Sequence, residues 1–248
     1  MPHTEGKRYA VVSCHVERPL DDACWAAFSA FQASCPGGFR IAALIRPPDE
    51  RAGEDGGLWL ERARLAAANG PLGHHTHFVG PQHARPAGGA PEHAGRVRSE
   101  AAWLREHGVE PRFFCGGGWY IDESVAGALV DLGYVDCTAT AFTPAYLAAG
   151  AARLAADRPA WLTLPDGRRL LELPSTHSLG MASRATLGRL PIDVHVYFHD
   201  TDLLSRTRRA ALRAALGMLA RRSTVTDLDG LCESSGGAPV LPFSLAAA

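Results

Sequence analysis

The sequence lacks any long apolar run. No stretch approaches the roughly 18 consecutive apolar residues that a membrane-spanning helix requires. Its first residues, M-P-H-T-E-G-K-R-Y, contain no apolar segment of the kind found in secretory signal peptides. We therefore expect a cytoplasmic protein with no membrane partner.

An excess of either charge is also absent. The chain has 25 Lys and Arg residues against 26 Asp and Glu residues, a formal net charge of −1. This balance gives no general attraction to nucleic acid, so no nucleic-acid partner is expected. The basic concentration at residues 206–222 lies in a predicted helix and is best explained as its solvent-exposed face.

Paired cysteines are missing as well. The six cysteines show no C-x-x-C pair and no zinc-finger spacing, which argues against a structural zinc site. Free thiols in a reducing compartment are the expected state. Without a neighbouring base, Cys115 is not expected to act as a nucleophile.

The 248 residues, 46% of them hydrophobic, are enough for one large domain with a substantial core. We expect a single domain over residues 1–248, with its core at about 9–231. The tail, 232–248, is rich in Ser, Gly, Pro and Ala and is expected to be flexible. Nothing in the sequence fixes the oligomeric state.

Strand-like and helix-like segments alternate along most of the chain. Short β-prone runs are predicted at 9–17, 40–45, 71–79, 111–115, 134–138 and 192–198. Helices between them are predicted at 21–34, 57–68, 99–107, 122–132 and 206–222. This alternation is typical of parallel βα units, and a Pro-Asp-Gly turn at 165–167 predicts a β-hairpin that interrupts it.

Three histidines occupy four positions in the stretch P-L-G-H-H-T-H-F-V-G at residues 71–80. Side chains alternate faces along a strand, so His75 and His77 share one face and His74 points to the other. Two imidazoles on one face at a strand end are suited to binding a metal ion. For His74 a structural role is the better interpretation.

Two further polar groups follow predicted strands, His15 with Glu17 and His199 with Asp202. In a parallel barrel, the carboxyl ends of the strands surround one mouth, so these residues are expected to meet the histidine pair there. Two histidines from one strand and one from a neighbour would make the open three-ligand site of a catalytic zinc. The simpler interpretation of each residue is a hydrogen-bonded strand end, which we favour for His195 inside the barrel.

The residues from about 9 to 231 resemble the polysaccharide deacetylases of the NodB-homology type, carbohydrate esterase family 4. The segment V-S-C-H-V-E-R-P is similar to an aspartate motif of the family, with His15 at the place of the aspartate. L-G-H-H-T-H resembles its histidine-pair motif, and Y-F-H-D-T-D-L its histidine-aspartate motif. F-F-C-G-G-G-W-Y is similar in frame to a third motif, with Cys115 near the usual arginine.

The resemblance implies an α/β fold, a distorted (β/α) barrel of about seven parallel strands, here with a small β-hairpin insertion. It also implies metal-dependent removal of an acetyl group from a carbohydrate, with His199 as the general acid. Because the aspartate is replaced, His15 could complete a metal set with His75 and His77, with Glu17 as the catalytic base. Residues predicted to contact substrate are Cys115, Gly117, Trp119, Tyr120 and Asp202.

The hypothesis is therefore a hydrolase of an acetyl amide or ester that uses a divalent metal, Zn²⁺ first, with Co²⁺ or Ni²⁺ as alternatives. The expected partner is a small acetylated sugar or another carbohydrate-containing molecule. An alternative is a barrel that has lost catalysis and binds a carbohydrate or small molecule. A third hypothesis is a metal-independent hydrolase of a different amide.

Overall fold

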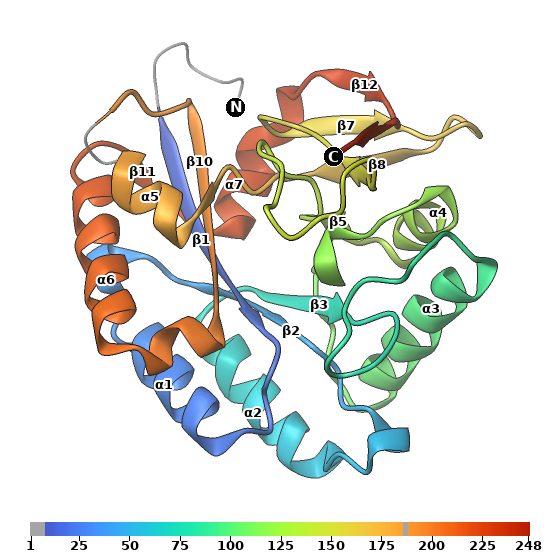
Figure 1. Ribbon diagram of the computed structural model, residues 1–248, viewed down its shortest axis with the longest axis horizontal. Coiled ribbons are helices and arrows are strands. Elements are labelled where there is room, and N and C mark those ends of the chain that lie inside the picture. The colour runs from blue at the N-terminus through green and yellow to red at the C-terminus, as the bar shows by residue number, and fades with distance from the viewer. Residues whose placement is uncertain (1–7, 186–187) are drawn as a thin grey trace.

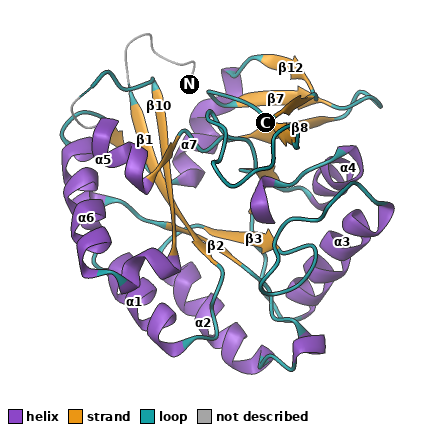
Figure 2. Ribbon diagram, viewed as in Figure 1, coloured by secondary structure: helices purple, strands orange, loops and turns teal. Residues whose placement is uncertain are grey.

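The computed structural model describes residues 8–185 and 188–248. Its strands are β1 (Tyr9–Val16), β2 (Ala42–Ile45), β3 (Leu72–Thr76), β4 (Phe113–Gly116), β5 (Val135–Asp136), β6 (Ala152–Leu154), β7 (Ala160–Thr163), β8 (Arg169–Glu172), β9 (His177–Ser178), β10 (Asp193–His199), β11 (Thr224–Val225), β12 (Val240–Pro242) and β13 (Leu245–Ala247). The α-helices are α1 (Asp22–Ala33), α2 (Gly56–Asn69), α3 (Pro91–Glu106), α4 (Glu123–Leu132), α5 (Leu179–Ala185), α6 (Arg206–Ala220) and α7 (Leu228–Ser234). Helices surround a twisted central sheet (Figures 1 and 2).

The central sheet forms the barrel that the sequence predicts. Parallel pairing runs in the order β5-β4-β3-β2-β1-β10. Strand β8 then pairs with β5 through Asp136 and Glu172, and β9 pairs with β10. Between β8 and β9, the Leu173 N–H donates to the Asp136 carbonyl and the Thr176 N–H donates to the His195 carbonyl. Within the described residues, the segment from β8 to β9 therefore acts as one strand and closes a distorted ring of seven.

The predicted β-hairpin is present as β7 and β8, which pair antiparallel. Because β8 is also a barrel strand, the hairpin is built into the barrel wall. The C-terminal tail, expected to be loose, pairs with this region: β12 runs parallel to β7, and β13 runs antiparallel to β6. The pairing gives residues 240–242 and 245–247 of the tail backbone partners that the composition of the tail did not indicate.

Helix starts agree with the sequence in most places. Asp21, Asp122 and Ser205 cap α1, α4 and α6 with their side chains, at or beside the helix starts that the sequence predicted. Helix α3 differs, because it begins at Pro91 and contains Ser99 in its interior. Proline is favoured in the first turn of a helix, where its missing N–H leaves no bond unmade. The segment between β8 and β10, where the sequence predicted neither a helix nor a strand, contains β9 and α5.

Side chains fill both the interior of the barrel and the space beneath its helices. The interior cluster includes Val11, Leu44, Phe113, Leu171 and Tyr197, which point inward at alternate positions of their strands. Separate buried clusters join the outer strand faces to the helices. The six cysteines all lie in the described part of the chain and are free thiols. Among the described helices, none is long and apolar enough to cross a membrane.

Candidate metal centre at the barrel mouth

Polar residues from three strands meet where these strands end. Strands β1 and β10 pair in a register that places His15 beside His199, and β2 joins β1 to β3. His75 lies near the end of β3, while Glu17 and His77 come directly after β1 and β3. Glu17 Oε1 lies within 4 Å of the Nε2 atoms of His75, His77 and His199.

His75 and His77 each have one ring nitrogen in a hydrogen bond, while the other ring nitrogen has no partner among the described residues. His75 Nδ1 donates to the Cys115 carbonyl at 2.9 Å, and His77 Nδ1 donates to the Pro81 carbonyl at 3.0 Å. Both Nε2 atoms are buried and have no hydrogen-bond partner among the described residues. Burial lowers the pKa of His77 to about 3, so its imidazole is neutral. Neutral imidazoles oriented through Nδ1 present Nε2 lone pairs, as metal-binding histidines do.

Glu17 lies opposite these free nitrogens. Its Oε1 is 3.9 Å from His75 Nε2, 3.8 Å from His77 Nε2 and 3.5 Å from His199 Nε2. Burial raises the pKa of the Glu17 carboxyl, but the surrounding imidazoles lower it to about 2. The carboxylate is therefore ionised at neutral pH and has its negative charge directed at the histidines.

Glu17, His75 and His77 fit the requirements of a divalent metal. One ligand atom from each lies within 4.8 Å of the others. Tetrahedral nitrogen and oxygen ligands at about 2.1 Å from zinc are roughly 3.4 Å apart, close to the separations between Glu17 and the histidines. Two buried nitrogens without partners, together with a carboxylate, are costly unless a cation or a proton occupies the space between them.

His199 borders this group, and Asp202 holds it in place. The His199 side chain is 31% exposed. Its backbone N–H donates to Asp202 Oδ2 at 3.0 Å, and Arg208 donates to Asp202 Oδ1 at 2.8 Å. Each carboxylate oxygen of Asp202 therefore accepts one hydrogen bond, from the His199 backbone or from Arg208. This arrangement favours a positioning role for Asp202 over the substrate contact that the sequence suggested.

His15 and Cys115 lie deeper in the barrel. His15 is 3% exposed and Cys115 is fully buried, with His15 Nε2 3.8 Å from Cys115 Sγ. A ligand group forms from His15, His75 and Cys115, but none among the described residues joins His15 to His77. The expected set of His15, His75 and His77 is therefore not brought together. Cys115, which the sequence placed among substrate contacts, is covered by other side chains.

The residues after β4, which begin with the glycines at 116–118, do not all point the same way. Trp119 contacts barrel-interior rings, whereas Tyr120 contacts Asp122. Trp119 adopts a positive φ of 59° and packs against His15 and Tyr197, with ring centroids 5.0 and 4.8 Å away. A Cβ on Gly117 would lie 2.9 Å from His77 Cδ2, so glycine permits this close approach. Tyr120 points elsewhere, with its hydroxyl donating to Asp122. Of the three, Tyr120 is therefore the one that does not reach the mouth.

Comparison with known proteins gives structural matches alone. No protein-family model matches the chain, and no curated protein matches its sequence. The Xyl-CE4 domain of a xylanase from the hindgut metagenome of Trinervitermes trinervoides aligns with a TM-score of 0.52 at 10% identity, over 93% of this chain and 92% of that domain. A mutant pseudoenzyme of the CE4 family with restored enzymatic activity aligns with a TM-score of 0.53 at 7% identity, over 97% and 71%.

The chain has the NodB-type, deacetylase-like barrel fold. A 4-α-glucanotransferase from Thermococcus litoralis shares the architecture, with a TM-score of 0.60 at 12% identity over 97% of this chain. This chain spans 40% of the length of that protein. At such identities the comparisons establish the fold and leave activity to be argued from the residues.

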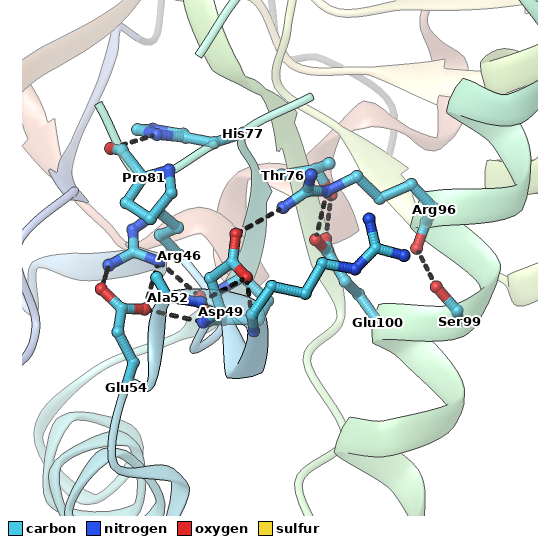
Figure 3. Close-up of polar contacts among 12 residues, drawn as sticks. Arg46, Asp49, Ala52, Glu54, Thr76, His77, Pro81, Arg96, Ser99 and Glu100 are labelled. Atoms are coloured by element: carbon cyan, nitrogen blue, oxygen red, sulfur yellow. Dashed lines mark hydrogen bonds and ion pairs between the residues drawn. The ribbon is translucent and has the colours of Figure 1, made fainter. Parts of the chain in front are cut away.

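Arg46, directly after β2, links Glu17 to Glu54, and its pairing with Glu54 is drawn in Figure 3. Its Nε donates to the Glu17 carbonyl at 3.0 Å, and its two terminal nitrogens pair with Glu54 at 2.8 and 2.6 Å. The sequence reasoning missed Arg46. A signal was available in its position at the end of the strand R-I-A-A-L-I, but only tertiary contacts link it to Glu17.

Aromatic residues that the sequence reasoning did not assign to the site line the mouth of the barrel. Tyr197 packs edge-on against His199, and Phe142 stacks on Tyr197 with parallel rings at 6.0 Å. Burial raises the pKa of Tyr197 to about 12, which keeps its hydroxyl protonated at neutral pH. Tyr146, on the same loop as Phe142, is 61% exposed. The alternation of β10 could have placed Tyr197 beside His199, whereas the loop aromatics carry no such signal.

A cavity of about 990 Å³ lies beside the histidine group. Pro81, which accepts the His77 hydrogen bond, belongs to its lining, as do Phe78, Arg96 and Glu100. The metal group itself is outside this cavity. The cavity and the histidines are therefore connected through the loop after β3.

Proposed function

We propose that the protein is a metal-dependent hydrolase that removes an acetyl group, held as an amide or an ester, from a carbohydrate or a carbohydrate-containing small molecule. The observation that carries this proposal is the pair of buried, unpartnered Nε2 atoms of His75 and His77, which face the Glu17 carboxylate. The deacetylase-like fold supports the reaction class.

Glu17, His75 and His77 would hold the metal, with Zn²⁺ as the first candidate and Co²⁺ or Ni²⁺ as alternatives. When bound, such an ion lowers the pKa of water toward about 7 and polarises a carbonyl. Glu17 is assigned to the ligand set because its Oε1 is nearly equidistant from both free nitrogens. This assignment replaces the base role that the sequence suggested for it, and it removes His15 from the ligand set.

His199 is the proposed proton donor. Its Nε2 lies 3.5 Å from Glu17 Oε1, and it is the one histidine of the group with an appreciably exposed side chain, at 31% against 1% and 3% for His75 and His77. A proton on Nε2 would pass to the amine nitrogen or alkoxide oxygen as the acyl bond breaks. Asp202 Oδ2 lies 3.9 Å from His199 Nδ1, and the ring of Tyr197 packs edge-on against the imidazole, so both neighbours position it.

The aromatic side chains at the mouth suit a sugar. Tyr197 and Phe142 offer apolar ring faces and edges, and Tyr146 adds an exposed ring on the same loop as Phe142. Sugar rings present flat C–H faces that pack on such surfaces while their hydroxyls remain solvated. The protonated Tyr197 hydroxyl can also donate a hydrogen bond to a polar group of the ligand.

The test is acetate release from a panel of N-acetylated and O-acetylated mono- and oligosaccharides, measured with metal-reconstituted protein. We expect turnover that is abolished by a chelator and restored by Zn²⁺ or Co²⁺. His199→Ala should lower kcat by roughly 10²–10⁴-fold while metal content is unchanged. Acetate release that persists after complete metal removal would contradict the mechanism.

A second candidate is a carbohydrate-binding barrel without turnover. The observation that favours it is the replacement of two polar positions of the family pattern by the buried His15 and Cys115. One structure that aligns with this chain is itself described as a pseudoenzyme with activity restored by mutation. Calorimetric binding of an acetylated sugar to a protein that releases no acetate with any metal would favour this candidate.

A further inference from the structure

A second group of ligand atoms lies beneath the proposed metal centre. His15 on β1, His75 on β3 and Cys115 on β4 place one nitrogen or sulfur atom each within 4.8 Å of the others. All three side chains are buried, with exposed fractions of 3%, 1% and 0%. This group thus comes from three strands of the barrel wall, in which β4 pairs with β3 and β2 lies between β3 and β1.

The separations within this inner group suit a cation. Tetrahedral zinc with nitrogen at about 2.1 Å and sulfur at about 2.3 Å has these ligands roughly 3.6 Å apart. His15 Nε2 and Cys115 Sγ are 3.8 Å apart. The thiol also has a long 3.8 Å contact to the Gly116 carbonyl. His75 Nε2 has no hydrogen-bond partner among the described residues. The three donors are therefore directed into the same space and are weakly used by the protein itself.

We propose that His15, His75 and Cys115 form an inner metal position that takes a thiophilic cation. Two imidazoles and a thiolate prefer softer ions such as Cd²⁺ or Cu⁺, whereas the outer group, with a carboxylate, suits Zn²⁺ and harder ions such as Mn²⁺. Binding converts the Cys115 thiol to a thiolate and releases its proton to solvent. Softer cations are therefore expected at the inner position and harder cations at the outer one.

His75 belongs to both groups. Its Nδ1 is occupied by the Cys115 carbonyl, so Nε2 is the single nitrogen that either group can use. One ion at the inner position therefore excludes three-ligand binding at the outer one. This competition rests on the proposed outer centre, whereas the existence of the inner position does not. A thiophilic ion would accordingly act as an inhibitor of the proposed hydrolase.

Cd²⁺ titration followed by ultraviolet difference absorption tests the inner position, because a thiolate bound to cadmium gives a charge-transfer band and carboxylate or imidazole ligands do not. The titrations use the full chain in the Cys35→Ser/Cys232→Ser background, which removes the two cysteines that are not buried. We expect the band to saturate at one Cd²⁺ per chain. It should persist in Glu17→Gln and disappear in Cys115→Ser, with Cd²⁺ affinity weakened on the order of tenfold or more.

Cys14→Ser is the matched control, because Cys14 is equally buried and adjoins His15 on the opposite face of β1. It should keep the band. The proposal would be overturned if the band were absent in the Cys35→Ser/Cys232→Ser protein, an outcome that does not depend on whether another variant folds. It would also be overturned if the band survived in Cys115→Ser. Saturation at two Cd²⁺ per chain would overturn the exclusion through His75. None of these readings depends on acetate release, so failure of the inner position and failure of the proposed hydrolase are separable.

Discussion

His74 and His75 are neighbours on β3, yet the two faces of that strand treat them in opposite ways. On the outer face, His74 Nε2 lies 2.8 Å from Glu100 and 3.0 Å from the Thr76 hydroxyl, and its Nδ1 is 3.2 Å from the Tyr134 hydroxyl. On the inner face, the Nε2 atoms of His75 and His77 have no partner within the described chain. Both faces are buried, so solvent does not account for the difference.

The comparison shows that the hydrogen-bond state of a buried histidine is more informative than its burial. On the outer face, Arg96 extends the network by pairing with Glu100 at 2.8 Å and lies 3.7 Å from Asp49 (Figure 3). Such saturated networks stabilise a fold. The inner face leaves nitrogens unpaired in a rigid wall, a cost that proteins tolerate where a ligand later satisfies them.

The largest expected effect comes from removing His75 and His77, the two histidines with unpaired Nε2 atoms. His75→Ala/His77→Ala should abolish stoichiometric binding of Zn²⁺ or Co²⁺, with affinity falling by well over 100-fold because two of three ligands are lost. Elemental analysis of metal-loaded, desalted protein measures this. His74→Ala is the control and should keep about one equivalent. Equal metal content in the double variant and the wild type would show that His75 and His77 are not metal ligands, and it would contradict the proposed difference between the two faces.

His74→Ala should instead act on stability. The substitution leaves Glu100 and Tyr134 without their buried partner, which we expect to lower the free energy of unfolding by about 2–4 kcal/mol. Urea unfolding of the metal-free protein measures the change. His107→Ala is a suitable control, since the ring nitrogen of the partly buried His107 bonds to the Trp103 carbonyl of the preceding helix turn and to no buried carboxylate among the described residues. Similar destabilisation by both variants would argue against a special role for the outer network.

Arg46→Lys should lower the metal affinity indirectly, through Glu17. Lysine keeps the charge but cannot bond the Glu17 carbonyl and both Glu54 oxygens together, so Glu17 loses its support. We expect metal affinity to fall roughly 10–100-fold. Competition with a chromogenic chelator measures it. Arg96→Lys, in the outer network, should leave the affinity unchanged, and a matching loss there would show that the two faces are coupled.

The smallest effect concerns another buried polar pair, Asp136 and Glu172, which pair across β5 and β8. One oxygen of each carboxyl is buried without a hydrogen-bond partner among the described residues. Burial raises the pKa of both carboxyls, so we expect the pair to share a proton. A raised folded-state pKa gives stability below the ordinary pKa of about 4.5 that is lost as the pH rises.

Glu172→Gln removes this titration while keeping a hydrogen-bond donor for Asp136. Relative to wild type, the variant should therefore gain stability between pH 4.5 and pH 8, by about 1 kcal/mol or more. Urea unfolding at several pH values measures the slope. If the difference in free energy of unfolding between variant and wild type were constant across this range, the shared proton would be contradicted.

Local patterns in the sequence were enough to predict much of the fold. The βα alternation, the caps Asp21, Asp122 and Ser205, and the Pro-Asp-Gly hairpin all depend on residues within a few positions of one another. The two faces of β3 were predicted for the same reason, because side-chain alternation is a property of the strand itself. Local competition also explains the error at α3, where a start at Pro91 prevailed over Ser99.

The ligand groups were decided by the tertiary structure alone. The partners that fix the Nδ1 atoms, the carbonyls of Cys115 and Pro81, come from β4 and from the loop after β3. Alternation predicts that His15 and Glu17 share a face, but strand register and curvature decide which of them reaches His77. The sequence therefore determined which side chains point into the barrel. Which atoms remain free there depends on long-range pairing between strands, which no local pattern encodes.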